Sequence, residues 1–191
     1  MENKLLSQKQ VPVSESGEDT HGFSVVKEVW QVGQEKRTYW KYNLPDVVVI
    51  FARTVGGKVI AVSEFQPGAG VEYLHLPAET MEKGERPFET ALRGLLEETG
   101  YCAGSIRLLS SVLENAGHSN RLVHLILALG CEKKCEVHEE GIETVLLDPA
   151  VFWERLIQHF STNPETKHGG GNSLKATALA LEALGLLHVS S

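Results

Sequence analysis

The chain has 191 residues, of which 42% are hydrophobic, and a formal net charge of −7 at pH 7. This length and apolar content suit one medium-sized domain with its own core, or one domain with an added element. The acidic balance and the absence of a long basic run argue against a nucleic-acid polymer as partner, but they permit a nucleotide whose phosphates are neutralised by a metal.

No segment of the sequence has the character of a membrane anchor or a secretory signal. The longest apolar stretches, VVVIFA and LILALG, are far too short to span a bilayer. The first residues lack a continuous apolar region with a cleavage site. Three cysteines cannot all pair with one another, so we expect free thiols and a cytoplasmic location. The short apolar stretches indicate that no membrane partner is expected.

Residues 1–44 are expected to form an arm and a β-hairpin. Residues 1–22 are polar and predict a loose arm with one short strand at most. Residues 23–32 and 36–44 are rich in Val, Trp and Tyr and flank a turn at Gly33, a pattern typical of a hairpin. A lone hairpin is marginally stable, so we expect its aromatic residues to pack in a homodimer. These residues are Trp30, Tyr39, Trp40 and Tyr42, although Trp40 and Tyr42 also suit stacking on a base.

The remaining residues, 45–191, are expected to form one domain. The apolar run 46–53 predicts a central strand buried on both faces. Further strands are expected over 58–65, 71–76, 105–114, 121–130 and 142–147, and helices over 149–160 and 173–187. Strands interleaved with helices predict a mixed sheet flanked by helices, an α/β/α sandwich.

Residues 76–101, LPAETMEKGERPFETALRGLLEETGY, carry most of the functional information. Pro87 suits the first position of a helix and Gly100 its C-terminal cap. The helical spacing of five apolar residues predicts one buried face, made of Phe88, Ala91, Leu92, Leu95 and Leu96.

Glu97 and Glu98 stand side by side near the end of this helix. Two carboxylates there repel each other and are unfavourable with the helix dipole. A bound cation would relieve both problems, and oxygen ligands of this kind suit Mg²⁺ or Mn²⁺.

The same stretch resembles the Nudix hydrolase signature, Gly-x5-Glu-x7-Arg-Glu-U-x-Glu-Glu-x-Gly-U, where U is an aliphatic or aromatic residue. Seven positions match in register, namely Glu85, Arg93, Leu95, Glu97, Glu98, Gly100 and Tyr101. The resemblance implies a Nudix α/β/α fold and Mg²⁺-dependent cleavage of a nucleoside diphosphate linked to another moiety. The preceding hairpin is similar to the ADP-ribose and nucleotide-sugar branch, whose members commonly form homodimers. Gln66-Pro67 stands where that branch often has an arginine, and the absence of this arginine argues against ADP-ribose itself as the substrate.

The resemblance also implies roles for single residues. Glu98 would be a direct metal ligand and a catalytic residue, and Glu97 a ligand or a water orienter. The backbone carbonyl of Ala78 would be a further ligand. Glu85, Arg93 and Gly100 would be structural. A downstream carboxylate usually acts as base or ligand, and the candidates are Glu136, Glu139, Glu140 and Glu143, among which Glu140 is best placed.

Two signature positions depart from the family pattern: Glu79 replaces its first glycine and Gly94 replaces a helix glutamate. In one interpretation the carboxylate has moved from helix to loop, with Gly94 giving room for Glu79 as a metal ligand. In a second, the chain has lost its chemistry and is a catalytically impaired Nudix module that binds nucleotide-like ligands or a protein. In a third, the coincidence of the two changes has no meaning and weak activity remains.

Overall fold

The computed structural model describes residues 3–11, 23–67, 70–137, 141–158 and 171–186. The chain divides into two compact units. The first comprises Met1–Asp46 with Leu113–Leu122, and the second Val47–Val112 with Val123–Ser191. None of the helices in the described ranges has the length and apolar character needed to cross a membrane.

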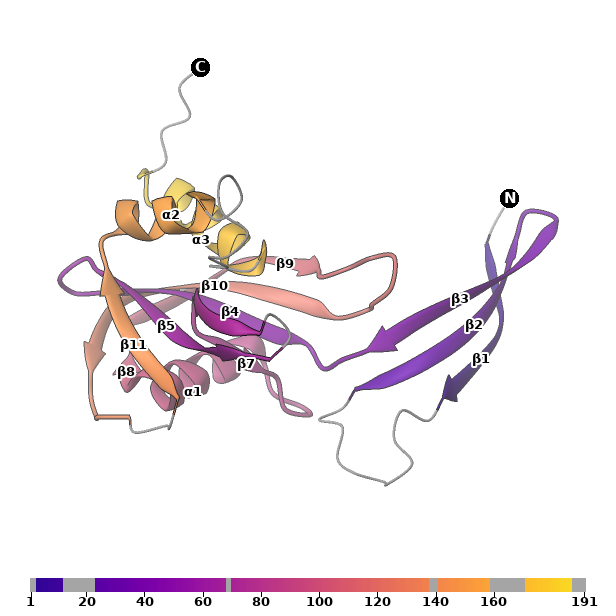
Figure 1. The fold of residues 1–191 in the computed structure, drawn as a ribbon, viewed down its shortest axis with the longest axis horizontal. Helices are drawn as coiled ribbons and strands as arrows, with labels where there is room; N and C mark the ends of the chain where they lie inside the picture. The colour runs from indigo at the N-terminus through magenta and orange to yellow at the C-terminus, as the bar shows by residue number, and fades with distance from the viewer. Residues whose placement is uncertain (1–2, 12–22, 68–69, 138–140, 159–170, 187–191) are drawn as a thin grey trace, which may run out of the picture. The chain divides into compact units, whose positions relative to one another are not determined.

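The first unit is built on a three-stranded antiparallel sheet (Figure 1). Its strands are β1 (Lys4–Val11), β2 (Ser24–Val32) and β3 (Glu35–Asn43), in the order β1-β2-β3. The hairpin expected from sequence is β2–β3, which turns at Gly33 with a positive φ of 62°. The segment 113–122 joins this unit because Tyr42 donates its N–H to the His118 carbonyl and Leu122 donates to the Asp46 carboxylate. The N-terminal antiparallel sheet is therefore confirmed, with β1 as an added full-length strand.

The second unit is an eight-stranded mixed sheet between helices (Figure 1). Its strands are β4 (Val47–Thr54), β5 (Val59–Gln66), β6 (Val71–His75), β7 (Ala78–Thr80), β8 (Tyr101–Cys102), β9 (Ser105–Leu113), β10 (Leu122–Lys133) and β11 (Ile142–Leu147). The helix α1 (Pro87–Thr99) covers one face, and α2 (Pro149–Gln158) and α3 (Gly171–Ala183) cover the other. β10 runs parallel to β4, whereas β5 and β7 pair antiparallel with β4, so the predicted α/β/α sandwich is confirmed.

Strand β4 forms the centre of the core. Its alternate residues Val48, Ile50 and Ala52 face the cluster that contains residues of α1. The intervening residues face the cluster under α2 and α3. All six residues of Val47–Ala52 are buried, as the apolar run predicts for a strand covered on both faces.

The buried face of α1 differs from the predicted face. Ala91 and Leu95 are buried as expected, but Phe88, Leu92 and Leu96 are 42%, 45% and 36% exposed. Their places in the interface are taken by Thr90, Gly94 and Thr99. The helix is turned so that Gly94 meets β7, and the two threonine hydroxyls are satisfied by local acceptors, the Glu85 carboxylate and the Leu95 carbonyl.

This orientation predicts very different costs for two leucines of one helix. Leu95→Ala should lower the free energy of unfolding by about 2–5 kcal/mol, because it leaves a cavity under α1. Leu92→Ala, the matched control on the exposed side, should change it by less than about 0.5–1 kcal/mol. Urea unfolding of both variants measures the difference, and equal losses would contradict the observed face.

Candidate active site

The loop and helix of the signature are joined by Arg93. Its Nε and Nη2 donate to the two carboxylate oxygens of Glu85, at 3.0 and 2.9 Å, and Nη2 also donates to the Thr80 carbonyl at 3.1 Å. This paired geometry fixes orientation as well as charge. The loop that carries residues 80–85 is therefore held against the second turn of α1.

Glu85 receives further donors. The Glu82 N–H and the Thr90 hydroxyl both reach its Oε2 at 2.9 Å. The hydrogen bond from Arg93, followed by that from the Glu82 backbone, lowers the pKa of Glu85 from 4.5 to about 2. The same pair raises the pKa of Arg93. Glu85 is thus ionised at neutral pH, because its pKa lies near 2.

Both ends of α1 are closed by local contacts. At its start the Arg86 N–H donates to the Glu89 carboxylate at 2.9 Å, ahead of Pro87. At its end Gly100 adopts φ 74°, and a Cβ there would lie 2.1 Å from the Cys135 carbonyl oxygen. The N–H groups of Lys134 and Cys135 both donate to the Gly100 carbonyl, which holds residue 135 close to the Gly100 Cα. Only glycine fits this position, because any side chain would meet the Cys135 backbone.

Two further carboxylates converge on Arg93. Its Nη1 lies 3.3 Å from Glu79 Oε2 and 3.2 Å from Glu97 Oε2. Glu79 comes from β7 and Glu97 from α1, so residues of two elements meet at a single positively charged nitrogen. Glu98, the next residue of the helix, is half-buried, and Ala78 pairs with Val49 of β4 beside Glu79.

The four downstream acidic candidates differ in their positions and partners. Glu140 and Glu139 lie outside the described residues. Glu136 is exposed and paired with Lys133 at 2.6 Å. Glu143 pairs in register with Ser63 and lies on the same face of β11 as Val145 and Leu147, which pack in the core under α2 and α3, so it faces away from α1.

A divalent cation such as Mg²⁺ would need several oxygen donors grouped around one point. Within the described ranges, no three His, Cys, Asp or Glu side chains are grouped as a metal site in this arrangement, in which Arg93 holds Glu79 and Glu97. The available donors are nevertheless carboxylates, which suit Mg²⁺ and Mn²⁺. The space beside Gly94 is also filled by a carboxylate-bearing side chain, that of Glu79. In their donor chemistry these residues therefore suit a hard divalent cation.

Residues 43–150 match the family model described as NUDIX domain. The chain belongs to the Nudix family. The resemblance carried by the signature is confirmed, and the match covers β4 to β11 together with α1.

Three curated relatives are similar to parts of the chain. The ADP-ribose pyrophosphatase of Bacillus subtilis (strain 168) is 35% identical over 105 residues, which are 53% of this chain and 57% of that protein. The methanol dehydrogenase activator of Bacillus methanolicus is 36% identical over 47% of this chain and 49% of its own length. The ADP-sugar pyrophosphatase of Mus musculus is 37% identical over 42% and 37%, respectively. The chain thus spans about half, or less, of the relatives it matches.

A solved structure is similar over almost the whole chain. The crystal structure of an ADP compounds hydrolase superposes with a TM-score of 0.78 and covers 98% of both chains, at 18% sequence identity. At this identity the likeness supports the Nudix fold and does not extend to the activity.

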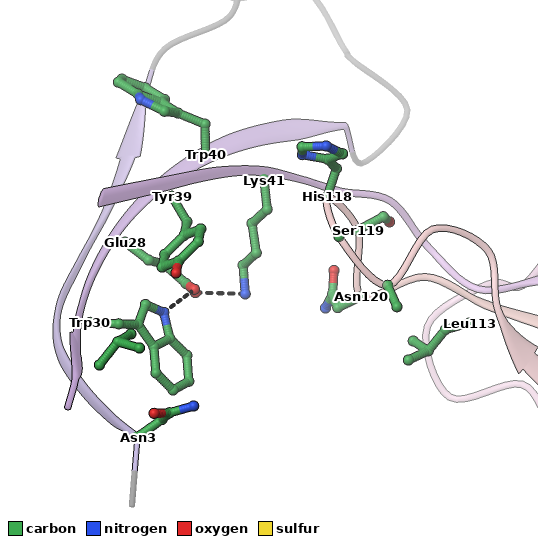
Figure 2. Close-up of a pocket in the computed structure, with 13 residues that line it drawn as sticks. Asn3, Glu28, Trp30, Tyr39, Trp40, Lys41, Leu113, His118, Ser119 and Asn120 are labelled. Carbon is green, nitrogen blue, oxygen red and sulfur yellow. Dashed lines mark hydrogen bonds and ion pairs between the residues drawn. The ribbon is translucent and has the colours of Figure 1, made fainter. Parts of the chain in front are cut away.

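The first unit contains a concavity of its own. A pocket of about 500 Å³ is lined by aromatic and polar side chains, including Trp30, Tyr39, Trp40, Lys41 and His118 (Figure 2). On its wall the buried Glu28 pairs with Lys41 Nζ at 2.6 Å and accepts the Trp30 indole N–H at 2.9 Å. The hydrogen bond from Lys41 lowers the pKa of Glu28, so this wall carries a fixed ion pair.

Sequence reasoning did not anticipate the contacts of Thr80, Thr90 and Glu28. Thr90 lies one turn before Gly94 on the buried side of α1, so a correct assignment of the buried face would have identified it. Glu28 lies opposite Tyr39 in the hairpin, and Lys41 is two residues further along β3, so the two side chains are diagonal neighbours. The hairpin turn at Gly33 determines this register. That register was available from the sequence, but the burial of Glu28 was not.

Proposed function

We propose that the chain is a Mg²⁺- or Mn²⁺-dependent Nudix hydrolase. Its substrate would be a nucleoside diphosphate linked to another moiety, of the ADP-ribose or ADP-sugar kind, cleaved at the pyrophosphate. Family membership supports this, as do the names of two relatives, ADP-ribose pyrophosphatase and ADP-sugar pyrophosphatase. The observation that carries the proposal is the Arg93 network, because it brings carboxylates of the loop and the helix to one point.

The chain's own residues would divide the work. A bound divalent cation lowers the pKa of a coordinated water and offsets phosphate charge. Glu98 and Glu97 would hold the cation, together with the Ala78 carbonyl. Arg93 and Glu85 would keep the loop and helix in place as positioning residues. Glu140 remains the candidate for the base.

A second function has one observation in its favour. Gly94 removes a carboxylate from the helix, which suits a Nudix module that binds a nucleotide-like ligand or a protein without cleaving it. The two functions differ in turnover, whereas both permit ligand binding.

A turnover screen separates the two. The full chain with Mg²⁺ or Mn²⁺ is expected to release a nucleoside monophosphate from ADP-ribose, an ADP-sugar or a dinucleotide, measured by chromatography. Glu98→Gln keeps the shape but removes a charge, and should weaken metal affinity about tenfold or more, which is about 1.4 kcal/mol. Glu72→Gln, an exposed strand residue on the face opposite α1, is the matched control.

If no product forms from any of these substrates with either metal, the hydrolase is rejected and the binding module remains. Unchanged metal affinity of Glu98→Gln, measured by calorimetry, would remove Glu98 from the site.

We also propose that the first unit takes part in a homodimer. It exposes several large apolar side chains, namely Leu5, Leu6, Tyr39 and Trp40. Among the hydrophobic residues of its sheet, Val26 is buried, and most others are half-buried or exposed. A sheet with so little core is stabilised by further packing.

Light scattering tests this partner directly. The full chain should have the mass of a dimer at micromolar concentration, and Trp40→Lys should shift it toward the monomer by placing a charge on the apolar surface. Val55→Lys changes a residue of the second unit that is 71% exposed and should leave the mass unchanged. A monomeric full chain would contradict the proposal.

A further inference from the structure

The two departures from the signature lie in contact. Glu79 and Gly94 are 15 positions apart in sequence, but β7 runs against α1. A Cβ built on Gly94 would lie 2.5 Å from Cβ and 2.9 Å from Cγ of Glu79. Carbon atoms that are not bonded cannot approach this closely, since van der Waals contact between them begins near about 3.5 Å. With the two backbones at this distance, only one of the two positions can carry a side chain.

The Glu79 carboxylate occupies the space that a side chain at position 94 would enter. Its Oε2 lies 3.4 Å from the built Cβ, and its Oε1 accepts the Thr80 N–H at 2.8 Å. Positions 97 and 98 are three and four residues from 94, so all three share one patch of the helix surface. The strand residue thus presents a carboxylate to the patch from which the family's helix glutamate projects.

We infer that Glu79 supplies the metal-binding carboxylate that other Nudix proteins take from the helix position of Gly94. The exchange is reciprocal, because the glutamate has moved to the strand and the glycine to the helix, while the number of carboxylates stays the same. The inference deepens the proposed function and rests on its metal requirement. Glu79 would act beside Glu98 and Glu97, following directly on the Ala78 carbonyl.

The contact with Arg93 is consistent with this role. The Arg93 guanidinium lies between Glu79 and Glu97, with its Nη1 at 3.3 and 3.2 Å from their carboxylate oxygens. A divalent cation would compete for the same oxygens. If Glu79 were only a partner of Arg93, its removal would affect stability and leave metal affinity unchanged, so the two roles have different readouts.

Metal affinity and thermal unfolding should be measured on the same variants, with Mn²⁺ as the probe followed by electron paramagnetic resonance. Glu79→Gln keeps the packing against Gly94 and removes the charge, so Mn²⁺ affinity should fall about tenfold or more. Glu72→Gln carries the same change of charge on the opposite face of the sheet and should bind as the unchanged protein does. Equal Mn²⁺ affinity of Glu79→Gln and Glu72→Gln would overturn the inference.

Exchanging the residues at positions 79 and 94 is a more stringent test of the inference. Glu79→Gly alone should lose Mn²⁺ affinity, and the double variant Glu79→Gly with Gly94→Glu should regain it to within about threefold, since residues that share one site are not additive. Gly94→Glu alone should not raise Mn²⁺ affinity, because Glu79 fills the space that the new side chain would need. A rise in Mn²⁺ affinity or turnover for that single variant would mean that the helix ligand had simply been lost.

A small probe tests the steric step separately. Gly94→Ala adds one methyl group and should lower the unfolding midpoint by about 2 °C or more, since overpacking is destabilising. In the Glu79→Gly background the same change should raise the midpoint, because alanine favours a helix over glycine. The same sign in both backgrounds would refute the exclusion of one side chain by the other.

Failure of this inference is distinguishable from failure of the proposed function. Metal-dependent turnover with Mn²⁺ affinity unaffected by Glu79→Gln leaves the hydrolase standing and rejects Glu79 as a ligand. Mn²⁺ binding through Glu79 without turnover of any substrate keeps the ligand and rejects the hydrolase.

Discussion

The close approach of β7 and α1 is the constraint on which the site depends. The two backbones lie near enough that a single side chain fits between them at Glu79 and Gly94. This contact orients α1, since the Gly94 side of the helix must face the strand. It consequently turns Leu92 and Leu96 outward and places Glu97 toward the loop. The packing of α1 and the geometry of the acidic site thus depend on the same contact.

Arg93 supplies the electrostatic counterpart of that contact. Glu79, Glu85 and Glu97 would repel one another if they were gathered without a cation, and one guanidinium pairs with all three. Glu85 accepts a bidentate contact, which fixes the loop, whereas Glu79 and Glu97 each make one contact at Nη1. The network therefore combines a firm anchor at Glu85 with two carboxylates that are each held by a single contact.

Much of the fold follows from local signals in the sequence. The apolar run of β4, the turn at Gly33 and the ends of α1 at Pro87 and Gly100 are each determined by residues within a few positions. The short strands β7 and β8 were not anticipated, because two or three residues become a strand only through pairing with β4 and β10. The buried face of α1 was wrong for three residues, because the apolar stripe does not show that a glycine faces the sheet.

For the site, the signature alone brought Glu85, Arg93, Glu97 and Glu98 to attention, and spacing along a helix made the proximity of Arg93 to Glu97 predictable. The three-way pairing at Arg93 was not predictable, since it joins a strand, a loop and a helix. The most direct test of Glu79 as a metal ligand is a crystal structure with Mn²⁺, located by its anomalous scattering. We expect the ion to be coordinated by a Glu79 carboxylate oxygen together with Glu98. An ion bound by Glu97 and Glu98 while Glu79 stays on Arg93 would contradict a ligand role for Glu79.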